Sequence, residues 1–576
     1  MRYIALATDY DGTLAHHGTV EERSVQVLER VKASGRKLLL VTGRHLPDLK
    51  NVFPRIGLFD YVVVENGALL YCPATRETTL LCEPPPPAFL AELQRRKVPF
   101  ETGRAIVSTW TPHQNEVLEA IRELALDLQV VFNKGAVMVL PSGVNKATGL
   151  HAALEELDLS FHNTVALGDA ENDHAFLSAA ECGVAVANAV PALLDRADVH
   201  TENRNGAGVT EIAEQLLRDD LAQYDDRLRR HSITLGTYRG PAADEDEPEK
   251  ELRIHAQRNG ILIAGPSASG KSTTVAGILE QLAEQKYQFC LIDPEGDYEY
   301  FAGALSFGTA KEKPDPEAIN KALASPDRSV IVNLMALPVA ERPEYFAALL
   351  PRILEWRTRT ARPHWLVIDE AHHLLPISWT PAATTIPPAL KGIMLITVHP
   401  EHVSPPILKF IDAAVVTGNS APETLAAFAK AAGFRVPQTS EKPAETGQAL
   451  VWFTNSPSAT LVNVHASKAE RRRHRRNYAE GELSPDQSFY FRGPDLKLNL
   501  RAQNLMTFLQ IADGVDDETW LYHLGHSDYS HWFEAVIKDS DLARAAKAVE
   551  HNGKLSAAES RAKIKNAIES RYTAAV

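Results

Sequence analysis

The sequence has few cysteines and no long apolar run, and these two absences narrow what the protein can be. Its 576 residues include only four cysteines, and no two of them have the CxxC spacing of a metal or redox motif. We therefore expect reduced, buried thiols, as in a cytoplasmic protein, and no disulfide framework. No stretch approaches the roughly 18 apolar residues of a membrane-spanning helix, so no membrane association is expected. The N-terminal MRYIALATDYDG has too short an apolar run for a signal peptide and predicts a buried strand instead.

An excess of positive charge is also missing. The formal net charge is −14 at pH 7, which excludes a surface that is basic throughout and confines any nucleic-acid contact to a local patch. The apolar fraction of 44% and the charged fraction of 23% are ordinary for a globular protein. A chain of this length is too long for one hydrophobic core and predicts roughly two to four domains.

The sequence does contain a repeated alternation of short apolar runs and amphipathic segments, which is typical of parallel sheets covered by helices. Changes in this pattern predict the domain organisation. The predicted parts are an α/β domain over 1–222 with an inserted α+β module at about 80–142, a polar, acidic linker over 223–252, a second α/β domain over 253–466, a basic linker over 467–485 and a small helical domain over 486–576.

Acidic residues at two predicted strand ends indicate the chemistry of the first domain. Asp9 and Asp11 in DYDGT stand two residues apart where a strand ends, so one carboxylate can attack phosphorus while the other donates a proton to the leaving oxygen. Such an anionic site needs a divalent cation, and Mg²⁺ prefers carboxylate and phosphate oxygens. Further acids follow a later strand in GDAENDHAF. Groups that can bind phosphate stand in VTGR and in VNKATGL, where the lysine starts a predicted helix.

These four motifs, in this order, resemble those of the haloacid dehalogenase superfamily of phosphohydrolases, over about residues 1–215. The position of the insert is similar to that in the Cof-like subgroup, whose cap closes over sugar phosphates or other small phosphomonoesters. The resemblance implies a Rossmann-like fold, with Asp9 as nucleophile and Asp11 as general acid/base. The other implied roles are phosphoryl binding by Thr42 and Lys146, Mg²⁺ binding by Asp169 with Asp9 and the main chain of Asp11, support of the metal and the phosphate by Asn172 and Asp173, and contact of Arg44 with the leaving group. The alternative, that these acids only cap strands and helices, requires four motifs to agree by accident.

A second phosphate site is predicted in the second α/β domain. GPSASGKSTT lies between the apolar run GILIA and an amphipathic segment, and it matches the G-x-x-x-x-G-K-[ST] loop whose backbone N–H groups surround nucleotide phosphates. In this pattern Lys271 reaches the β and γ oxygens and Ser272 binds Mg²⁺. In WLVIDEAHH, Asp369 is assigned to the Mg²⁺ shell and Glu370 to the attacking water. The residues assigned to ATP are Gly265, Ser269, Gly270, Lys271, Ser272 and Thr273.

Together with CLIDPEGDYEYF and LITVHPEHVSPPIL, these motifs resemble the HerA/FtsK branch of P-loop ATPases, over about residues 253–465. The resemblance implies a RecA-like fold, ATP as ligand, action on DNA and a homo-oligomer, for which a hexamer is favoured. The sequence departs from the family at its polar sensor, because Val398 cannot hydrogen-bond the γ-phosphate or its water. This puts the turnover rate in doubt, although not nucleotide binding. The β-barrel that usually precedes the loop is at most residual, in SITLGTYRG and ELRIHA. The candidates for an implied arginine finger are Arg352, Arg357, Arg359 and Arg362.

Histidine and arginine groups elsewhere carry weaker signals. His399 and His402 have HxxH spacing, and His523, His526 and His531 stand near two tryptophans. Neither group has a cysteine or a third ligand at a convincing spacing for zinc. The basic stretch SKAERRRHRRN is interpreted as a solvated segment that pairs with acidic residues. Contact with a DNA backbone is the less favoured alternative, because no aromatic residues interleave with the arginines.

The sequence therefore predicts a Mg²⁺-dependent phosphomonoester hydrolase fused to an ATP-binding and ATP-hydrolysing module that assembles or regulates it. The expected partners are a small phosphorylated substrate, ATP and further copies of the same chain. Two alternatives stay open. One is an ATP-driven DNA translocase whose phosphatase domain processes nucleic-acid ends, and the other is a nucleotide-sensing scaffold with little ATP turnover. The substrate itself cannot be read from the sequence, because the cap loops that select it vary freely.

Overall fold

The chain divides into two compact units, Met1–His465 and Ala466–Val576. The computed structural model describes all residues except 134, 226, 229, 239–248, 258, 267–268, 300, 380–390, 440–443, 446, 466–487, 538, 554 and 573–576. The predicted basic stretch, at 467–477, lies outside the described residues. Within the described part, no helix has both the length and the hydrophobicity needed to cross a membrane.

An eight-stranded sheet forms the centre of the N-terminal part of the first unit, in the order β12-β11-β10-β1-β2-β3-β4-β5. The strands from β12 to β3 are parallel, and β4 and β5 pair antiparallel at one edge. The strands are β1 (Ala5–Thr8), β2 (Lys37–Val41), β3 (Tyr61–Val64), β4 (Leu69–Tyr71), β5 (Thr78–Leu80), β10 (Thr164–Gly168), β11 (Cys182–Ala185) and β12 (Val199–His200).

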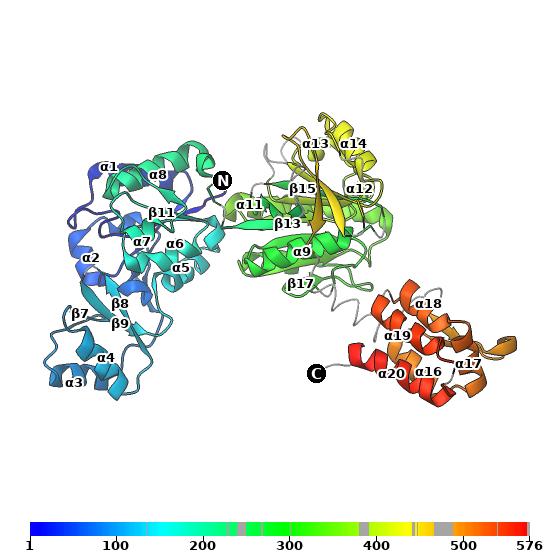
Figure 1. Ribbon diagram of the computed structural model, residues 1–576. Coiled ribbons are helices and arrows are strands. Elements are labelled where there is room, and N and C mark those ends of the chain that lie inside the picture. The colour runs from blue at the N-terminus through cyan, green and yellow to red at the C-terminus, as the bar shows by residue number, and fades with distance from the viewer. Residues whose placement is uncertain are drawn as a thin grey trace. The chain divides into compact units, whose positions relative to one another are not determined.

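Helices cover both faces of this sheet, because side chains alternate between the faces along each strand. The helices on one face are α1 (Glu22–Ala33), α2 (Leu46–Val52) and α8 (Asn205–Asp219), and those on the other are α5 (Lys146–Glu155), α6 (His174–Ala179) and α7 (Pro191–Leu194). In β1, Leu6 points to the face covered by α1, α2 and α8, whereas Ala5 and Ala7 point to the opposite face. Figure 1 shows α1 and α8 on one side of the sheet and α5, α6 and α7 on the other.

The segment between β5 and α5 forms a separate small layer. Its antiparallel sheet has the order β6-β7-β9-β8. Pro87 occupies the first turn of α3, where the N–H that proline lacks has no intrahelical partner anyway. The elements are β6 (Glu101–Thr102), β7 (Val107–Trp110), β8 (Leu128–Asn133), β9 (Ala136–Pro141), α3 (Pro87–Arg95) and α4 (Gln114–Glu123).

The remainder of the first unit is built on an eleven-stranded sheet in the order β14-β13-β23-β22-β21-β15-β20-β19-β16-β18-β17. The strands from β21 to β17 are parallel. The described residues of SITLGTYRG form β13, and ELRIHA contains most of β14; these two strands pair with each other and extend the sheet through β23. The strands are β13 (Ser232–Tyr238), β14 (Lys250–His255), β15 (Gly260–Ala264), β16 (Phe289–Asp293), β17 (Ala304–Phe307), β18 (Ser329–Asn333), β19 (Trp365–Ile368), β20 (Ile393–Thr397), β21 (Ala413–Thr417), β22 (Gln448–Phe453) and β23 (Thr460–Val464).

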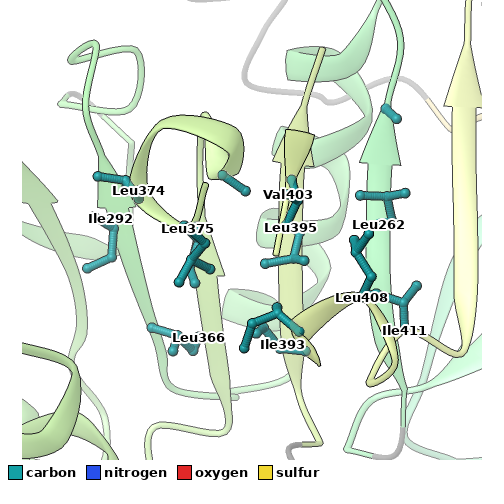
Figure 2. Packing of buried hydrophobic residues seen from close by; sticks show 14 of the residues in the cluster. Leu262, Ile292, Leu366, Leu374, Leu375, Ile393, Leu395, Val403, Leu408 and Ile411 are labelled. Atoms are coloured by element: carbon teal, nitrogen blue, oxygen red, sulfur yellow. The ribbon is translucent and has the colours of Figure 1, made fainter. Parts of the chain in front are cut away.

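Both faces of the second sheet are also buried. Ile261 and Ile263 of β15 face the cluster that contains α9, whereas Leu262 and Ala264 face the cluster that contains the other helices. Figure 2 shows the latter face, where Leu262, Leu366 and Leu395 from neighbouring strands form one apolar layer. The helices are α9 (Lys271–Glu284), α10 (Pro316–Ala324), α11 (Arg342–Thr360), α12 (Ala371–Leu374), α13 (Pro405–Leu408) and α14 (Ala421–Ala432).

A buried polar junction joins the two sheets of the first unit. His162 lies just before β10 and places its Nδ1 at 2.8 Å from an oxygen of Glu181, to which Tyr287 also donates a hydrogen bond of 2.7 Å. The Nε2 of His162 donates to the carbonyl of Gln285 at 2.7 Å, and its ring stacks on Tyr287 at 3.7 Å between centroids. Burial alone would raise the pKa of Glu181, but the hydrogen bond with His162 and the nearby Arg2 lower this pKa below its ordinary value. Glu181 therefore stays ionised and ties the two sheets together.

His364 gives this junction a pH dependence that can be measured. Burial lowers its pKa well below the ordinary value, and His162 and Arg362 lower it further. As the pH falls below about 6.5, the unfolded chain takes up a proton that the folded chain refuses, so folding loses about 1.4 kcal/mol per pH unit. Other groups change the stability in the opposite direction as the pH falls. Asp293 is one of them, because burial raises its pKa to about 6. We therefore compare wild type with His364→Gln by denaturant unfolding between pH 7 and pH 5.

Between these two pH values, wild type should lose about 2 kcal/mol of unfolding free energy relative to His364→Gln. The glutamine keeps polar atoms for the partners of His364, which are the backbone N–H of Gln288 and the hydroxyl of Ser160. A difference between the two proteins that does not change with pH would contradict the prediction.

The four cysteines are free, as expected, but only two of them are buried. Cys182 and Cys290 lie inside the sheets, whereas Cys72 and Cys82 are half-buried. The expectation that all four are buried was wrong because Cys72 and Cys82 lie just beyond the ends of β4 and β5, the last two strands at one side of the first sheet.

The second unit has its own apolar core, formed by a short antiparallel pair and helices. Phe491, Phe508 and Trp520 are among its buried aromatic side chains. The elements are β24 (Phe489–Phe491), β25 (Leu500–Ala502), α16 (Leu505–Gly514), α17 (Asp517–Gly525), α18 (Asp528–Ala535), α19 (Ser540–Glu550) and α20 (Ala557–Tyr572).

Candidate functional site

Three carboxylates and a lysine meet at the carboxyl edge of the first sheet. Asp9 directly follows β1 and Asp169 directly follows β10, and these two strands are parallel neighbours. Asp173 ends the short helix Glu171–Asp173, and Lys146 is the first residue of α5. Asp9, Asp169 and Asp173 are buried, and each offers an oxygen within 4.8 Å of the others. The structure therefore brings together residues that the sequence places more than a hundred positions apart.

Lys146 is held between two of these acids. Its Nζ lies 2.6 Å from Asp9 Oδ1 and 2.5 Å from Asp173 Oδ1, and the lysine is only 1% exposed. The second oxygen of Asp173 accepts hydrogen bonds of 2.8 Å from the backbone N–H groups of Asp169 and Ala170. Burial alone would lower the pKa of Lys146, but Asp173 and Asp9 raise it. Lys146 is therefore a permanent cation fixed beside Asp9.

The same residues fit a divalent cation. Burial raises the pKa of Asp9. The neighbouring carboxylates of Asp173 and Asp169 raise this pKa further, whereas Lys146 lowers it. Three buried carboxylates against one ammonium leave an excess of negative charge, and oxygen donors of this kind suit Mg²⁺. Thr13 donates a hydrogen bond of 3.1 Å to Asp169 Oδ1 and so orients this carboxylate. Thr13 belongs to the motif DYDGT, but sequence reasoning considered only the acids of that motif.

Asp11 and Arg44 form an ion pair at the more exposed side of this cluster. The guanidinium contacts both oxygens of Asp11, at 2.5 and 2.7 Å. The side chain of Asp11 is 42% exposed, compared with 6% for Asp9. Thr42 directly follows β2, the other neighbour of β1, and its buried hydroxyl accepts the backbone N–H of Arg44 at 3.2 Å. Asp11 is thus placed where a leaving group can reach solvent.

Asn172 and Asn66 line the same edge of the sheet. The amide of Asn172 donates a hydrogen bond of 3.0 Å to Asn66 Oδ1, while its own Oδ1 is buried without a hydrogen-bond partner among the described residues. An unpaired buried acceptor of this kind suits contact with a bound ligand. Asn66 was not identified from the sequence.

Glu65 connects the inserted module to this edge of the first sheet. Its oxygens accept hydrogen bonds of 2.9 and 2.8 Å from the backbone N–H groups of Arg104 and Ala105, in the loop between β6 and β7. Burial would raise the pKa of Glu65, but His45 and these N–H groups lower it overall. Glu65 also has a positive φ of 52°, a backbone conformation that is uncommon outside glycine and is often found at functional sites. The carboxylate therefore anchors the loop of the inserted module, a role that the sequence did not reveal.

The predicted nucleotide loop follows β15 in the second sheet. Gly265 and Gly270 have φ values of 149° and 98°, and a Cβ at Gly265 would lie 2.5 Å from the carbonyl of Thr417. Only glycine fits such a position without strain. Lys271 begins α9 and donates to the carbonyls of Gly265 and Pro266 at 2.8 and 2.9 Å. Ser269 contacts the hydroxyl of Thr417 at 2.6 Å, and Ser272 and Thr273 follow in the first turn of α9.

The acids expected to accompany this loop lie at the same edge of the sheet. Asp369 and Glu370 directly follow β19, which is separated from β15 by β20 alone. Burial lowers the pKa of Lys271, against the opposing influence of Glu370 and Asp369. Burial also raises the pKa values of Asp369 and Glu370. The three groups therefore interact electrostatically in a partly desolvated setting.

Two of the four candidate arginine fingers, Arg357 and Arg362, make hydrogen bonds to the chain itself. Arg362 is 1% exposed and donates to the carbonyl of Asp158 at 3.1 Å and to Gln288 Oε1 at 2.8 Å. Arg357 donates to the carbonyls of Gly392 and His364 at 3.4 Å. Neither guanidinium is available to a neighbouring subunit in this arrangement. Arg352 and Arg359 are exposed and remain candidates.

The histidines of the second unit are not brought together as a metal site. His523 is buried, with Nδ1 at 2.7 Å from Asp528 and Nε2 accepting the backbone N–H of Arg492 at 3.0 Å. His526 uses its Nδ1 to donate to the carbonyl of Tyr522 at 2.7 Å. Among the described residues, no group of three closely spaced metal-binding side chains includes His523, His526 or His531.

Comparisons with known proteins identify relatives of the N-terminal part. The family described as haloacid dehalogenase-like hydrolase matches residues 6–94 and 101–212. The chain is 31% identical over 228 residues to phosphoglycolate phosphatase 2 of Saccharolobus solfataricus, covering 38% of this chain and 95% of that protein. It is also 31% identical over 225 residues to the phosphoglycolate phosphatase of Methanothermobacter thermautotrophicus, covering 37% of this chain and 98% of that protein. Among solved structures, a haloacid dehalogenase-like hydrolase from Bacteroides thetaiotaomicron is 20% identical, with a TM-score of 0.33, and the match covers 37% of this chain and 99% of that one.

Proposed function

Because this chain belongs, through its N-terminal part, to the haloacid dehalogenase-like hydrolases, we propose that residues 1–222 form a Mg²⁺-dependent phosphomonoesterase. The observation that carries the proposal is the contact of Lys146 with both Asp9 and Asp173 beside Asp169. This arrangement puts a buried carboxylate next to a fixed cation and an anionic, oxygen-rich position. A nucleophile, a phosphoryl-binding cation and a metal position are thus within one side-chain length of each other.

The chemistry proceeds in two displacements. An oxygen of Asp9 forms a bond to phosphorus as the ester P–O bond breaks, and Asp11, which enters this step as the protonated carboxyl, gives its proton to the leaving oxygen. Asp11 then takes a proton from water, which attacks the aspartyl phosphate and releases phosphate and free Asp9. Lys146 and Thr42 bind phosphoryl oxygens, and Arg44 orients Asp11. Neutralisation of the phosphoryl charge is what Mg²⁺ supplies when held by Asp9, Asp169 and the main chain of Asp11, with support from Asp173 and Asn172.

We propose a small phosphomonoester of the phosphoglycolate type as substrate, because the relatives described above are phosphoglycolate phosphatases. The test is phosphate release in Mg²⁺ from phosphoglycolate, a sugar phosphate, an aryl phosphate and a 3′-phosphorylated oligonucleotide. Preferential cleavage of phosphoglycolate supports the proposal. Cleavage of the oligonucleotide alone supports the alternative in which the protein processes nucleic-acid ends, and no release from any of the four contradicts a phosphatase.

We further propose that residues 253–466 form a RecA-like ATPase of the HerA/FtsK type, which binds ATP with Mg²⁺ and assembles the chain into a homo-oligomer, with a hexamer favoured. The proposal is supported by the glycine-dependent turn before Lys271 and by the placement of Asp369 and Glu370 one strand away from that loop. Val398 at the sensor position favours slow turnover. Tight ATP binding with almost no hydrolysis would support the scaffold alternative, and ATP hydrolysis stimulated by DNA would support the translocase.

Lys271→Ala should weaken ATP binding by roughly 10- to 100-fold, because a charge-assisted hydrogen bond contributes about 1.5–3 kcal/mol. The measurement is titration of the full chain with a fluorescent ATP analogue in Mg²⁺. Lys286→Ala is the matched control, because Lys286 is exposed just beyond the end of α9. Equal affinity of wild type and Lys271→Ala would contradict the assignment.

A further inference from the structure

Four histidines and two glutamates gather where β19 and β20 end. β19 is followed by Glu370, His372 and His373, and β20 is followed by His399, Glu401 and His402. Because these strands are parallel neighbours, the loops that follow them meet at one edge of the sheet. We call these six residues the histidine cluster. The sequence showed only the HxxH pair, since the two loops are separated by about 25 positions.

The spacing within the histidine cluster is that of potential metal ligands. The imidazole centroids of His372 and His399 lie 5.8 Å apart, and those of His399 and His402 lie 5.0 Å apart. His399, Glu401 and His402 offer ligand atoms within 4.8 Å of one another, and so do Glu370, His372 and His373. A tetrahedral ion with bonds of about 2.1 Å needs donors about 3.4 Å apart. Small rotations of the exposed His399 and His402 side chains can close that difference.

Further contacts hold these imidazoles in place. The hydroxyl of Thr397, the last residue of β20, lies 3.0 Å from His372 Nδ1 and accepts the backbone N–H of His399 at 3.1 Å. One side chain thus links both loops. Glu401 Oε1 lies 3.2 Å from His399 Nδ1. Hydroxyl and carboxylate partners of this kind orient metal-binding histidines.

The types of side chain in the histidine cluster also suit a metal ion. Imidazole together with carboxylate is a ligand set suited to Zn²⁺, Ni²⁺ and Cu²⁺, whereas Mg²⁺ is bound mainly by oxygen atoms.

We propose that the histidine cluster binds a transition-metal dication of the Zn²⁺ class through His399, Glu401 and His402, and that an imidazole from the loop after β19 completes the coordination. Such an ion ties α12 to the turn Pro400–His402 beside the predicted nucleotide loop. The site is distinct from the carboxylate cluster at Asp9, which belongs to the other sheet. The proposal rests neither on the phosphatase assignment nor on the ATPase assignment.

The test is titration of the purified full chain with Co²⁺ and Zn²⁺ in excess Mg²⁺, which occupies the carboxylate sites. Heat of binding gives affinity and stoichiometry. The visible absorption of Co²⁺ reports histidine ligation, because low-coordinate Co²⁺ absorbs more strongly than Co²⁺ bound by six oxygens. The double variant His399→Ala/His402→Ala should bind at least about 10-fold more weakly and lose the strong absorption, and His373→Ala should weaken binding or alter the spectrum.

The matched control is His526→Ala/His551→Ala, which removes two exposed histidines from the second unit and should leave both readouts unchanged. Metal-free unfolding midpoints of all variants show whether the fold is kept. All five substituted side chains are exposed, so the midpoints should agree. Equal affinity and an equal Co²⁺ spectrum in wild type and His399→Ala/His402→Ala would overturn the proposal.

Discussion

Asp9→Asn should abolish phosphate release, with a loss of at least about 10³-fold in kcat for any phosphomonoester that the wild type cleaves. The asparagine occupies nearly the same volume but lacks the charge that attacks phosphorus. It also removes one of the two carboxylates that contact Lys146. The measurement is steady-state phosphate release in Mg²⁺, with unfolding of both proteins compared to show that the fold is intact.

Glu171→Gln is the control for that substitution. Glu171 stands between Asp169 and Asp173 in the same motif but is exposed. The Glu171→Gln variant should therefore keep activity close to that of wild type. If Asp9→Asn retained a tenth or more of the wild-type rate, Asp9 would not be the nucleophile and the assignment of this site would fail.

Glu181→Gln should lower the free energy of unfolding of the first unit by about 3–5 kcal/mol. Glu181 is fully buried and satisfies His162 and Tyr287 at the junction between the two sheets. The substitution removes the buried carboxylate that accepts both of these hydrogen bonds, in a medium of low dielectric constant where the lost interactions cannot be replaced by water. Chemical denaturation at pH 7 followed by tryptophan fluorescence measures the change, and Trp365 is a buried reporter close to the junction.

A second histidine–glutamate pair provides the comparison. His151 and Glu155 are 3.7 Å apart on the exposed face of α5. Glu155→Gln should cost less than about 1 kcal/mol, because solvent already screens the pair. Equal effects of Glu155→Gln and Glu181→Gln would mean that the junction contributes no more than a surface contact.

The sequence predicted strands before the acidic motifs of the first domain and an apolar run before the predicted nucleotide loop. The strand predicted at the N-terminus is β1, the strand predicted before GDAENDHAF is β10, and GILIA forms β15. These predictions succeed because an apolar run bounded by turn residues is a local signal. The expectation for the cysteines was only half right, since burial at a sheet edge depends on strand order and not on residue type.

The sequence alone determined that Asp9, Lys146 and Lys271 stand at strand or helix ends in motifs suited to phosphate. Only the tertiary structure decided which of these groups touch. It placed Lys146 between Asp9 and Asp173, and it brought Glu65 into contact with the backbone of the inserted module. It also buried Arg362 among hydrogen-bond acceptors, and it brought His372 close to His399, which no spacing along the chain could indicate. The physical reason is that the order of parallel strands sets which loops are neighbours, and strands that adjoin in a sheet are often far apart in the chain.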